Sequence, residues 1–295
     1  MARHVYHLRI FADGPNGGNP LPLVVDSVGL TDAEMQAVAA SSGHESGFIF
    51  PAPENSNCHF EFRFWVPEHE MEMCGHATVG AVWMLEKLGR LPQHHVQILT
   101  KSGVVEAHVT KRKGGTWVQI SQARGVVDTL LDDNGIHENI FSALCIRGSD
   151  LAPEYPIQNS KTSRVKTVVP MKSVAILDGL QPQSNAVKSL CEKIGSTGLY
   201  PYAVVVGEGK QVFSARQFPR NSGYLEDAAT GIAASALAFA LLENGHVGTD
   251  GEIMVKQGRA MGAPSSIAIR FRKDDDGEVI GCWIGGTAVL EDDKS

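Results

Sequence analysis

Two short segments of the chain carry the residue types that could hold and activate a small acid. They are Cys74–Thr78 and Asp227–Gly231, and each lies where an apolar helical stretch is expected to begin. A helix start leaves backbone N–H groups unpaired and carries partial positive charge, so it binds a carboxylate. Glycine permits close approach of the backbone, and Thr78 and Thr230 add hydroxyl donors. We therefore expect both segments to bind a carboxylate-bearing ligand.

The remaining candidate groups form no recognised motif. Several histidines show no metal-ligand spacing, namely His44, His59, His69 and the His94-His95 pair. The five cysteines lack a C-x-x-C pair, which favours a reducing compartment over disulfides or structural zinc: Cys58, Cys74, Cys145, Cys191 and Cys282. The sequence also lacks the glycine-rich nucleotide motifs and H-E-x-x-H. We therefore expect chemistry that depends on side chains, with no metal and no cofactor.

The helices that begin at the two segments are expected to be buried on all sides. Apolar residues surround both helical stretches instead of forming one stripe, and such a helix must be enclosed by other elements. Phe62–Gly89 and Ala215–Gly245, compared without gaps, match at four positions about 152 residues apart: Pro67 with Pro219, Thr78 with Thr230, Ala81 with Ala233 and Leu85 with Leu237. This offset is half of the chain, so the sequence predicts that the same unit occurs twice.

Short segments of strand type surround each predicted helix. In the first half they are His4–Phe11, Leu21–Val25, Gly47–Phe50, His59–Val66, His95–Thr100, Val104–Val109 and Trp117–Ile120. In the second half they are Thr167–Pro170, Ser173–Leu177, Tyr202–Val206, Val212–Phe218, Ile253–Gln257, Ser266–Arg272 and Val279–Val289. A sheet curled around one central helix, formed twice, accounts for this pattern.

We therefore expect an α+β fold with two pseudo-symmetric lobes, residues 1–125 and 126–295. Each lobe is a curled, barrel-like mixed β-sheet around a central buried α-helix, the active site lies between the lobes, and the last strand can return to the first lobe. An outer helix is expected at Thr31–Ser42, because TDAE is a capping box and Gly43 ends the helical spacing. Residues 121–163 are rich in Pro, Asn and Gly, which predicts the connection between the lobes.

Charge and hydropathy disfavour several classes of partner. The chain has 26 Lys and Arg against 33 Asp and Glu, a net charge of −7, and no basic tract for nucleic acid. The most apolar stretch, Ala228–Leu242, is too short to span a bilayer, and the first residues lack an apolar core of signal-peptide length. With the scattered cysteines, this predicts a cytoplasmic protein that acts on a small molecule.

Six motifs, taken together, resemble one family. They are GGNP (17–20), HESGFIF (44–50), GHATVG (75–80), EDAATG (226–231), MGAPS (261–265) and GGTAV (285–289). In this order and at this separation they resemble the PhzF-like family of phenazine-biosynthesis isomerases. The resemblance implies the duplicated barrel-around-helix fold that this family shares with diaminopimelate epimerase. It further implies an isomerase without a cofactor, and a homodimer.

The resemblance also implies roles for three titratable residues. Glu45, in the turn after the outer helix, would be the general acid/base that moves a proton between substrate carbons. His76 and Asp227 would line the site and orient the substrate or relay protons. From position alone, Glu45 is typical of a solvated surface residue and Asp227 of a helix N-cap, and these alternatives stay open. The residues expected to bind substrate are Cys74, Gly75, Ala77, Thr78, Thr230 and Gly231.

Two departures from related enzymes bear on the chemistry. The related epimerases place a cysteine at each helix start, whereas the offset of about 152 residues matches Cys74 with Glu226. This disfavours a two-thiol racemase, and Cys74 is expected to fill space beside the helix. Ile232 stands where the phenazine enzyme has a serine after EDAATG, which disfavours the phenazine precursor as the substrate.

Three functions remain open. The leading hypothesis is a proton-shifting isomerase that acts on a small carboxylate-bearing metabolite, cyclic or unsaturated. The first alternative is an amino-acid epimerase in which Cys74 works with Glu45 or Asp227 as the opposite base. The second is a non-catalytic protein of the same fold that binds a metabolite or a partner.

Overall fold

The computed structural model describes residues 3–112, 114–205 and 211–291. The chain divides into two compact units: residues 1–121 with 284–295 form unit 1, and residues 122–283 form unit 2. β8 (Gly115–Ala123) and β17 (Val279–Gly286) pass from one unit into the other. Within the described ranges, none of the helices has both the length and the apolar character needed to cross a membrane.

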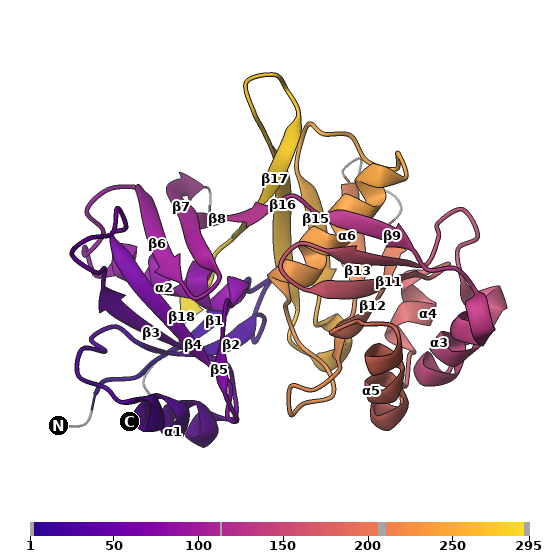
Figure 1. The fold of residues 1–295 in the computed structure, drawn as a ribbon, viewed down its shortest axis with the longest axis horizontal. Coiled ribbons are helices and arrows are strands. Elements are labelled where there is room, and N and C mark those ends of the chain that lie inside the picture. Colours follow the sequence, from indigo (N-terminus) through magenta and orange to yellow (C-terminus); the bar gives the residue numbers. More distant parts are fainter. Residues whose placement is uncertain (1–2, 113, 206–210, 292–295) are drawn as a thin grey trace. The chain divides into compact units, whose positions relative to one another are not determined.

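Unit 1 is built mainly of strands, with one inner and one outer helix (Figure 1). Besides β8, its strands are β1 (Tyr6–Ile10), β2 (Asn19–Val24), β3 (Ser46–Pro51), β4 (Phe60–Trp65), β5 (Glu70–Met71), β6 (His95–Thr100), β7 (Gly103–Arg112) and β18 (Ala288–Leu290). Its helices are α1 (Asp32–Ser42) and α2 (Gly75–Lys87).

Unit 2 has a similar set of strands and further helices on its outside. Besides β17, its strands are β9 (Val126–Thr129), β10 (Gln158–Lys161), β11 (Val165–Pro170), β12 (Gly198–Val204), β13 (Gln211–Ala215), β14 (Phe218–Pro219), β15 (Ile253–Gln257) and β16 (Ser265–Lys273). Its helices are α3 (Ile136–Leu144), α4 (Val174–Asp178), α5 (Ser184–Lys193) and α6 (Gly231–Glu243).

The two units repeat one pattern of strand pairing. In unit 1 the pairs are β1–β2 antiparallel, β2–β3 parallel, β3–β4 antiparallel, β4–β6 parallel and β6–β7 antiparallel. In unit 2 they are β10–β11 antiparallel, β11–β12 parallel, β12–β13 antiparallel, β13–β15 parallel and β15–β16 antiparallel. A further strand pairs antiparallel with the first strand of each of these two series, β18 with β1 and β9 with β10. The predicted α+β fold with two pseudo-symmetric halves is thus confirmed.

Each unit holds one helix that is buried on all sides (Figure 1). In α2 the residues from Gly75 to Leu85 are buried, and the helix packs against β1, β2, β3 and β7. In α6 the residues from Gly231 to Leu241 are buried, and the helix packs against β9, β10, β11 and β16. Gly80 lets α2 approach the sheet closely, because a Cβ there would lie 2.5 Å from Ile10 Cδ1.

The outer helix of unit 1 has the predicted start. Thr31 accepts a hydrogen bond from the Glu34 N–H, and the Glu34 side chain accepts one from the Thr31 N–H, as in a capping box. Gly43 ends α1 in the left-handed conformation at φ 69°. Met35 and Ala39 face a core with Val24, Phe48 and Trp65. This helix and its cap fix the chain direction just before residues 44 and 45.

Two expectations about local structure were wrong, and the bounds of one expected strand differ from those observed. Residues 121–163 do not form a plain connection, because they contain β9, α3 and β10 within unit 2. The segment expected as strand Ser173–Leu177 is helix α4, because Ser173 caps it by accepting from the Ile176 N–H at 3.2 Å. The strand expected at Tyr202–Val206 is β12, which begins earlier, at Gly198; residue 206 lies outside the described residues.

The gap-free comparison of the two halves also needs correction. The two buried helices begin at Gly75 and at Gly231, which stand 156 residues apart rather than 152. The shift of four residues is about one helical turn, so Thr78 lies inside α2 whereas Thr230 is the N-cap of α6. Cys74, the N-cap of α2, therefore corresponds to Thr230 and not to Glu226. Neither alignment gives Cys74 a second thiol as its counterpart.

Candidate active site

Three side chains with acid/base chemistry meet at the start of α2. The Cys74 thiol donates to Glu45 Oε2 at 2.9 Å, and His76 Nδ1 lies 3.3 Å from Cys74 Sγ. The same His76 nitrogen is 3.4 Å from Glu45 Oε2. The three atoms therefore form a compact triangle of carboxylate, thiol and imidazole. The side chain of Glu45 is only 15% exposed and that of His76 only 5%, so water has little access to them.

Two turns of the chain bring these residues together. Glu45 directly precedes β3, two residues after Gly43 turns the chain at the end of α1. Cys74 and His76 are the N-cap and the second residue of α2, which follows the short strand β5. Because β3 packs against α2 within the same unit, the residue just before β3 reaches the helix start. Glu45 is thus a part-buried member of a cluster, and the alternative of a solvated surface residue is wrong.

The start of α2 is open for a negatively charged group. No side chain from the described part of the chain caps this helix, and Thr78 N–H is the first that bonds back, to the Cys74 carbonyl at 3.0 Å. The N–H groups of Gly75, His76 and Ala77 precede it, at the positively polarised end of the helix. N–H groups in this arrangement at a helix N-terminus bind a carboxylate.

One ring nitrogen of His76 has no hydrogen-bond partner among the residues that the structure describes. Its Nε2 is buried and makes no hydrogen bond to any described residue. A buried polar atom left unpaired costs about 1–3 kcal/mol, so such an atom is rare unless a ligand meets it. When Nδ1 carries the proton and faces Glu45, Nε2 presents a lone pair. This is the electronic state needed to accept a hydrogen bond from a substrate.

Glutamate, cysteine and histidine are also zinc ligands, and the three ligand atoms lie within 4.8 Å of one another. A zinc ion with bonds of about 2.3 Å to sulfur and 2.0 Å to oxygen would hold these two atoms about 3.5 Å apart at a tetrahedral angle. Cys74 Sγ and Glu45 Oε2 are instead 2.9 Å apart, which is a hydrogen-bond distance. The geometry of the pair is therefore that of a protonated thiol on a carboxylate.

In unit 2, Asp227 belongs to a hydrogen-bonded network before α6. The Thr230 hydroxyl donates to Asp227 Oδ2, and Gln257 Nε2 donates to the Thr230 hydroxyl at 3.1 Å and to the Asp227 carbonyl at 2.7 Å. The Tyr200 hydroxyl donates to Gln257 Oε1 at 2.9 Å. Complete burial, with the nearby Asp227 charge, raises the pKa of Tyr200 well above its usual value, so it stays a neutral donor.

The N-cap of α6 is Thr230, so the alternative that Asp227 is merely the helix N-cap is wrong. Asp227 instead contacts the N-cap side chain and is half-buried. No described side chain caps α6, whose first N–H groups, those of Gly231 and Ile232, come before the helical bonding begins. The first N–H groups of α6 are therefore uncapped by described side chains, as are those of α2.

The two threonines use their hydroxyl protons inside the protein. The Thr78 hydroxyl donates to the Cys74 carbonyl at 2.8 Å, and Thr78 is fully buried. The Thr230 hydroxyl donates to Asp227. Both hydroxyls position the helix starts, and their expected donation to a ligand stays a prediction. Ile232 is buried, in agreement with an apolar residue at this place.

Glu226, next to Asp227 in the EDAATG motif, has a structural partner that the sequence did not suggest. Arg216 donates to both of its carboxylate oxygens, at 2.9 and 2.7 Å. The third nitrogen of the guanidinium donates to the carbonyl groups of Leu177, Asp178 and Leu180 at the end of α4. Arg216 and Glu226 thus form a buried pair that connects the loop before α6 to the end of α4.

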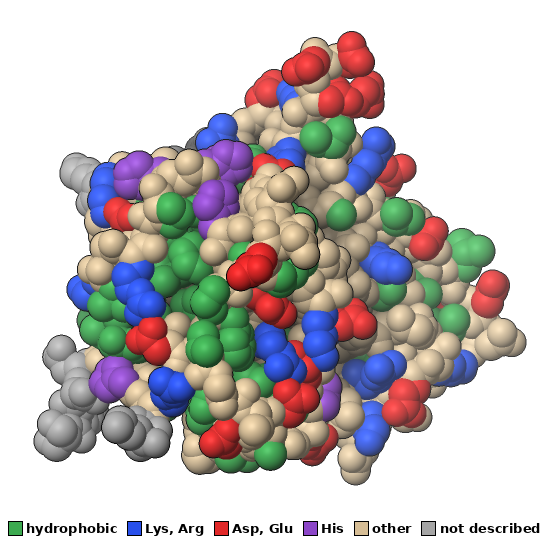
Figure 2. Space-filling view, turned by 60° about the vertical axis from the view of Figure 1, so that its left-hand side comes forward, with side chains coloured by type: hydrophobic (Ala, Val, Ile, Leu, Met, Phe, Trp, Pro, Cys, Tyr) green, Lys and Arg blue, Asp and Glu red, His purple; other side chains and the backbone are tan. Residues whose placement is uncertain are grey.

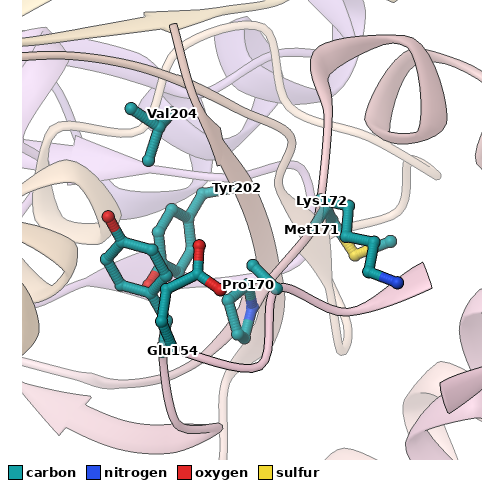
Figure 3. Close-up of a pocket in the computed structure, with 8 residues that line it drawn as sticks. Glu154, Pro170, Met171, Lys172, Tyr202 and Val204 are labelled. Atoms are coloured by element: carbon teal, nitrogen blue, oxygen red, sulfur yellow. The ribbon is translucent and has the colours of Figure 1, made fainter. Parts of the chain in front are cut away.

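A separate hollow of about 240 Å³ lies on unit 2 (Figure 3). It is lined by Ala152, Glu154, Tyr155, Pro170, Met171, Lys172, Tyr202 and Val204. None of the predicted site residues takes part. Its volume is below the range of about 300–1,000 Å³ that is usual for small-molecule sites. We therefore assign the candidate site by the clustered acid/base groups and not by this hollow.

Comparisons with known proteins agree with this architecture. A family model described as phenazine biosynthesis-like protein matches residues 8–293. The protein called uncharacterized isomerase YddE of Escherichia coli K12 is 28% identical over 295 residues, with 98% of this chain and 97% of the relative covered. A crystal structure of the Bacillus anthracis phenazine biosynthesis protein, PhzF family, has a TM-score of 0.88 at 25% identity, covering 98% of this chain and 97% of that one.

A more distant likeness concerns the fold alone. The structure of a probable proline racemase from Agrobacterium radiobacter K84 has a TM-score of 0.66 at 13% identity, with 98% of this chain and 91% of that chain covered. The match of the family model over nearly the whole sequence shows that this isomerase-like chain belongs to the phenazine biosynthesis-like (PhzC-PhzF) family.

Proposed function

We propose that the protein is a cofactor-independent isomerase that shifts a proton on a small, carboxylate-bearing metabolite, with Glu45 as the general acid/base. One observation carries this proposal: Glu45 Oε2 lies 2.9 Å from Cys74 Sγ and 3.4 Å from His76 Nδ1, at the open start of a buried helix. A carboxylate in such an enclosed place, with donors on one oxygen, can take a proton and return it.

The substrate carboxylate is proposed to bind the N–H groups of Gly75, His76 and Ala77. These groups lie beside Glu45 because Cys74, the N-cap, contacts the Glu45 carboxylate directly. The substrate carbon that loses its proton then lies near Glu45. The second oxygen of Glu45, Oε1, faces the substrate in this proposal while Oε2 is held by Cys74 and His76.

The proton shift balances without any other reagent. Glu45 takes a proton from one substrate carbon, and the electrons of the broken C–H bond form a new double bond to the next carbon. The electrons of the original double bond move to the far carbon, which takes the proton back from Glu45. The enzyme ends in its starting state. His76, through its Nε2, accepts a hydrogen bond from a polar group of the substrate and so fixes its orientation.

Asp227, Thr230 and Gly231 are proposed to act on the same substrate from the start of α6. The Thr230 hydroxyl and the backbone fix the Asp227 carboxylate before α6, and a fixed carboxylate orients a substrate hydroxyl or amine.

One specific observation favours the epimerase alternative. Cys74 Sγ lies 3.3 Å from His76 Nδ1, and a thiol beside an imidazole becomes a proton acceptor once the imidazole takes its proton.

The test begins with finding the substrate. Metabolites of cells with and without the protein are compared, and the compound that accumulates is incubated with pure protein in deuterated water. The isomerase moves a double bond and changes the ultraviolet spectrum, whereas an epimerase places deuterium at a stereocentre without a spectral change. Exchange at a stereocentre alone would replace the isomerase proposal by the epimerase.

Glu45→Gln gives the matched test of mechanism. Glutamine keeps the size of glutamate but cannot accept and return a proton, so turnover should fall by about 10²–10⁴-fold while substrate binding survives. Glu54→Gln, in the exposed loop between β3 and β4, is the control and should leave turnover unchanged. Binding of a metabolite with no turnover in the wild type would support the non-catalytic alternative instead.

We also propose a homodimer in the cytoplasm that binds no nucleic acid. Light scattering of the purified chain gives the mass of the assembly, and cell fractionation gives the location. A monomer in solution would remove the dimer from the proposal without affecting the chemistry of Glu45.

A further inference from the structure

A second cluster of ligating side chains lies on the hairpin of β6 and β7 in unit 1. It consists of His95, Glu106 and His108, whose ligand atoms all lie within 4.8 Å of one another. It has no part in the proposed proton shift. Figure 2 shows several histidine side chains close to one another on one part of the molecular surface, with other histidines apart from them. We propose that His95, Glu106 and His108 bind a divalent transition-metal ion of the zinc class.

The strand register puts all three side chains on one face. His95 in β6 is paired directly with His108 in β7, and Gln97 is paired with Glu106. Alternate residues of a strand face the same side, so Glu106 and His108 point the same way as His95. The residues adjacent to them in the strands, Val96, Ala107 and Val109, are buried on the opposite face. Since α2 packs against β7, the cluster lies on the outer face of the sheet.

The distances suit a shared ion. His95 Nε2 lies 3.6 Å from Glu106 Oε2, and the rings of His95 and His108 meet edge to face with their centroids 4.2 Å apart. Two ligands at about 2.0–2.2 Å from a tetrahedral zinc are separated by about 3.4 Å. Unlike the pair of Glu45 and Cys74, these atoms are too far apart for a strong hydrogen bond and close to the spacing that an ion requires.

The chemistry of the three groups selects the class of metal. Imidazole nitrogen and carboxylate oxygen suit zinc and its neighbours in the first transition row, whereas magnesium and calcium prefer sites made of oxygen alone. Three protein ligands leave a position for water, and the site is accessible because the His95 side chain is 55% exposed and that of Glu106 is 33% exposed. Such an ion would also link β6 to β7.

The hairpin is a rigid support for such a site. β6 and β7 are paired over their whole common length, from His95 with His108 to Thr100 with Gly103. The backbone N–H of Glu106 donates to the Ser121 hydroxyl at 2.9 Å, which ties β7 to β8. Ligands on paired strands need little reordering on binding, so less affinity is lost than at a site on loops.

The experiment uses the full chain without a histidine tag, stripped of metal with a chelator. Titration calorimetry with zinc chloride should show one saturable site per chain, and zinc should raise the thermal midpoint. His95→Ala and His108→Ala should each weaken zinc binding by at least tenfold and remove the rise in midpoint. His94→Ala is the matched control, because His94 is the exposed neighbour of His95 outside the cluster, and it should bind zinc like the wild type.

A second measurement separates this site from Glu45, Cys74 and His76. Cobalt bound to imidazole and carboxylate lacks the sulfur charge-transfer band that a thiolate ligand gives. We expect no such band in the wild type, and unchanged zinc binding in Cys74→Ser. The absence of saturable zinc binding, or binding that survives both histidine substitutions, would overturn the proposal. A sulfur band that disappears in Cys74→Ser would move the metal to the other cluster. The cobalt spectrum of the wild type decides the question even where a variant folds poorly.

Discussion

The thiol sulfur of Cys74 lies 2.9 Å from Oε2 of Glu45, although 29 residues separate the two along the chain. Cys74 ends the loop before the buried helix α2, and Glu45 ends the turn after the outer helix α1. The hydrogen bond therefore joins two elements that are far apart in the sequence. A contact of this kind orients the carboxylate, and its removal should affect chemistry more than folding.

Cys74→Ala should keep turnover within about tenfold of the wild type, a change of roughly 1.4 kcal/mol in the barrier. A thiol is a weak donor, and one hydrogen bond contributes about 0.5–1.5 kcal/mol net, so Glu45 keeps its function without it. Steady-state kinetics on the identified substrate measure the change. The thermal midpoint of the same variant shows whether the fold is intact.

A loss of several orders of magnitude in a well-folded Cys74→Ala would contradict this prediction. It would mean that the thiol itself takes or gives the proton, as in the epimerase alternative. Cys58→Ala provides the comparison, because Cys58 lies in the loop before β4 and outside the cluster. Its kinetics should equal those of the wild type.

Elements could be predicted from the sequence where the local residue pattern matches the place of the element in the fold. The capping box at Thr31 and Glu34 predicts a helix start without knowledge of the rest of the fold. In the same way, the apolar residues around α2 and α6 predict that both helices are buried. Helix α5 also had a pattern that could have been found, with Val187, Leu190 and Cys191 at helical spacing and buried.

Other features depend on contacts that no local pattern contains. Arg216 stands ten residues before Glu226, and Gln257 stands thirty residues after Asp227. Both lie outside the motifs, yet they fix Glu226 and Asp227 through hydrogen bonds. The contact of Glu45 with Cys74 arises from packing of β3 on α2, so position in the sequence alone suggested a surface residue. The ligand cluster of His95 and His108 depends on strand register, which the sequence leaves undetermined.

Gly80→Ala should destabilise unit 1 by about 1–3 kcal/mol, because overpacking strains a tight core. A Cβ at this position would meet Ile10 Cδ1 and Leu21 Cδ2, each at 2.5 Å, where α2 rests on the sheet. Gly248→Ala is the control, since a Cβ there meets nothing within 4 Å. Urea denaturation of both variants measures the difference. Equal stability of the two would show that α2, or the side chains of Ile10 and Leu21, can move at no cost.

Arg216→Met should lower the free energy of unfolding by about 3–5 kcal/mol. The substitution leaves the Glu226 carboxylate and several carbonyl groups without their donor in a place where the side chains are only about 10% exposed. The double variant Arg216→Met with Glu226→Met should lose less than the single one, because no charge stays buried. Denaturant midpoints of the two variants give the comparison.

Arg259→Met is the matched control for this pair. Arg259 forms an ion pair with Asp178 in α4, but its side chain is 59% exposed. Exposed pairs contribute less than about 1 kcal/mol, so this variant should unfold almost like the wild type. A similar small loss for Arg216→Met would show that the loop before α6 keeps its position without the guanidinium.

Asp227→Asn should lower turnover by about 10–100-fold and leave the fold intact. The amide oxygen of asparagine can still accept from the Thr230 hydroxyl, and the backbone bonds of Asp227 to Gln217 and Gln257 do not involve the side chain. What is lost is the negative charge that is proposed to orient the substrate.

The double variant Asp227→Asn with Glu45→Gln tests whether both carboxylates serve one reaction. Residues that act as a unit are strongly non-additive, so the double variant should be hardly slower than Glu45→Gln alone. Effects that add in full on the logarithmic scale would mean that Asp227 supports only the structure before α6, and an unchanged turnover in Asp227→Asn would remove it from the proposed mechanism.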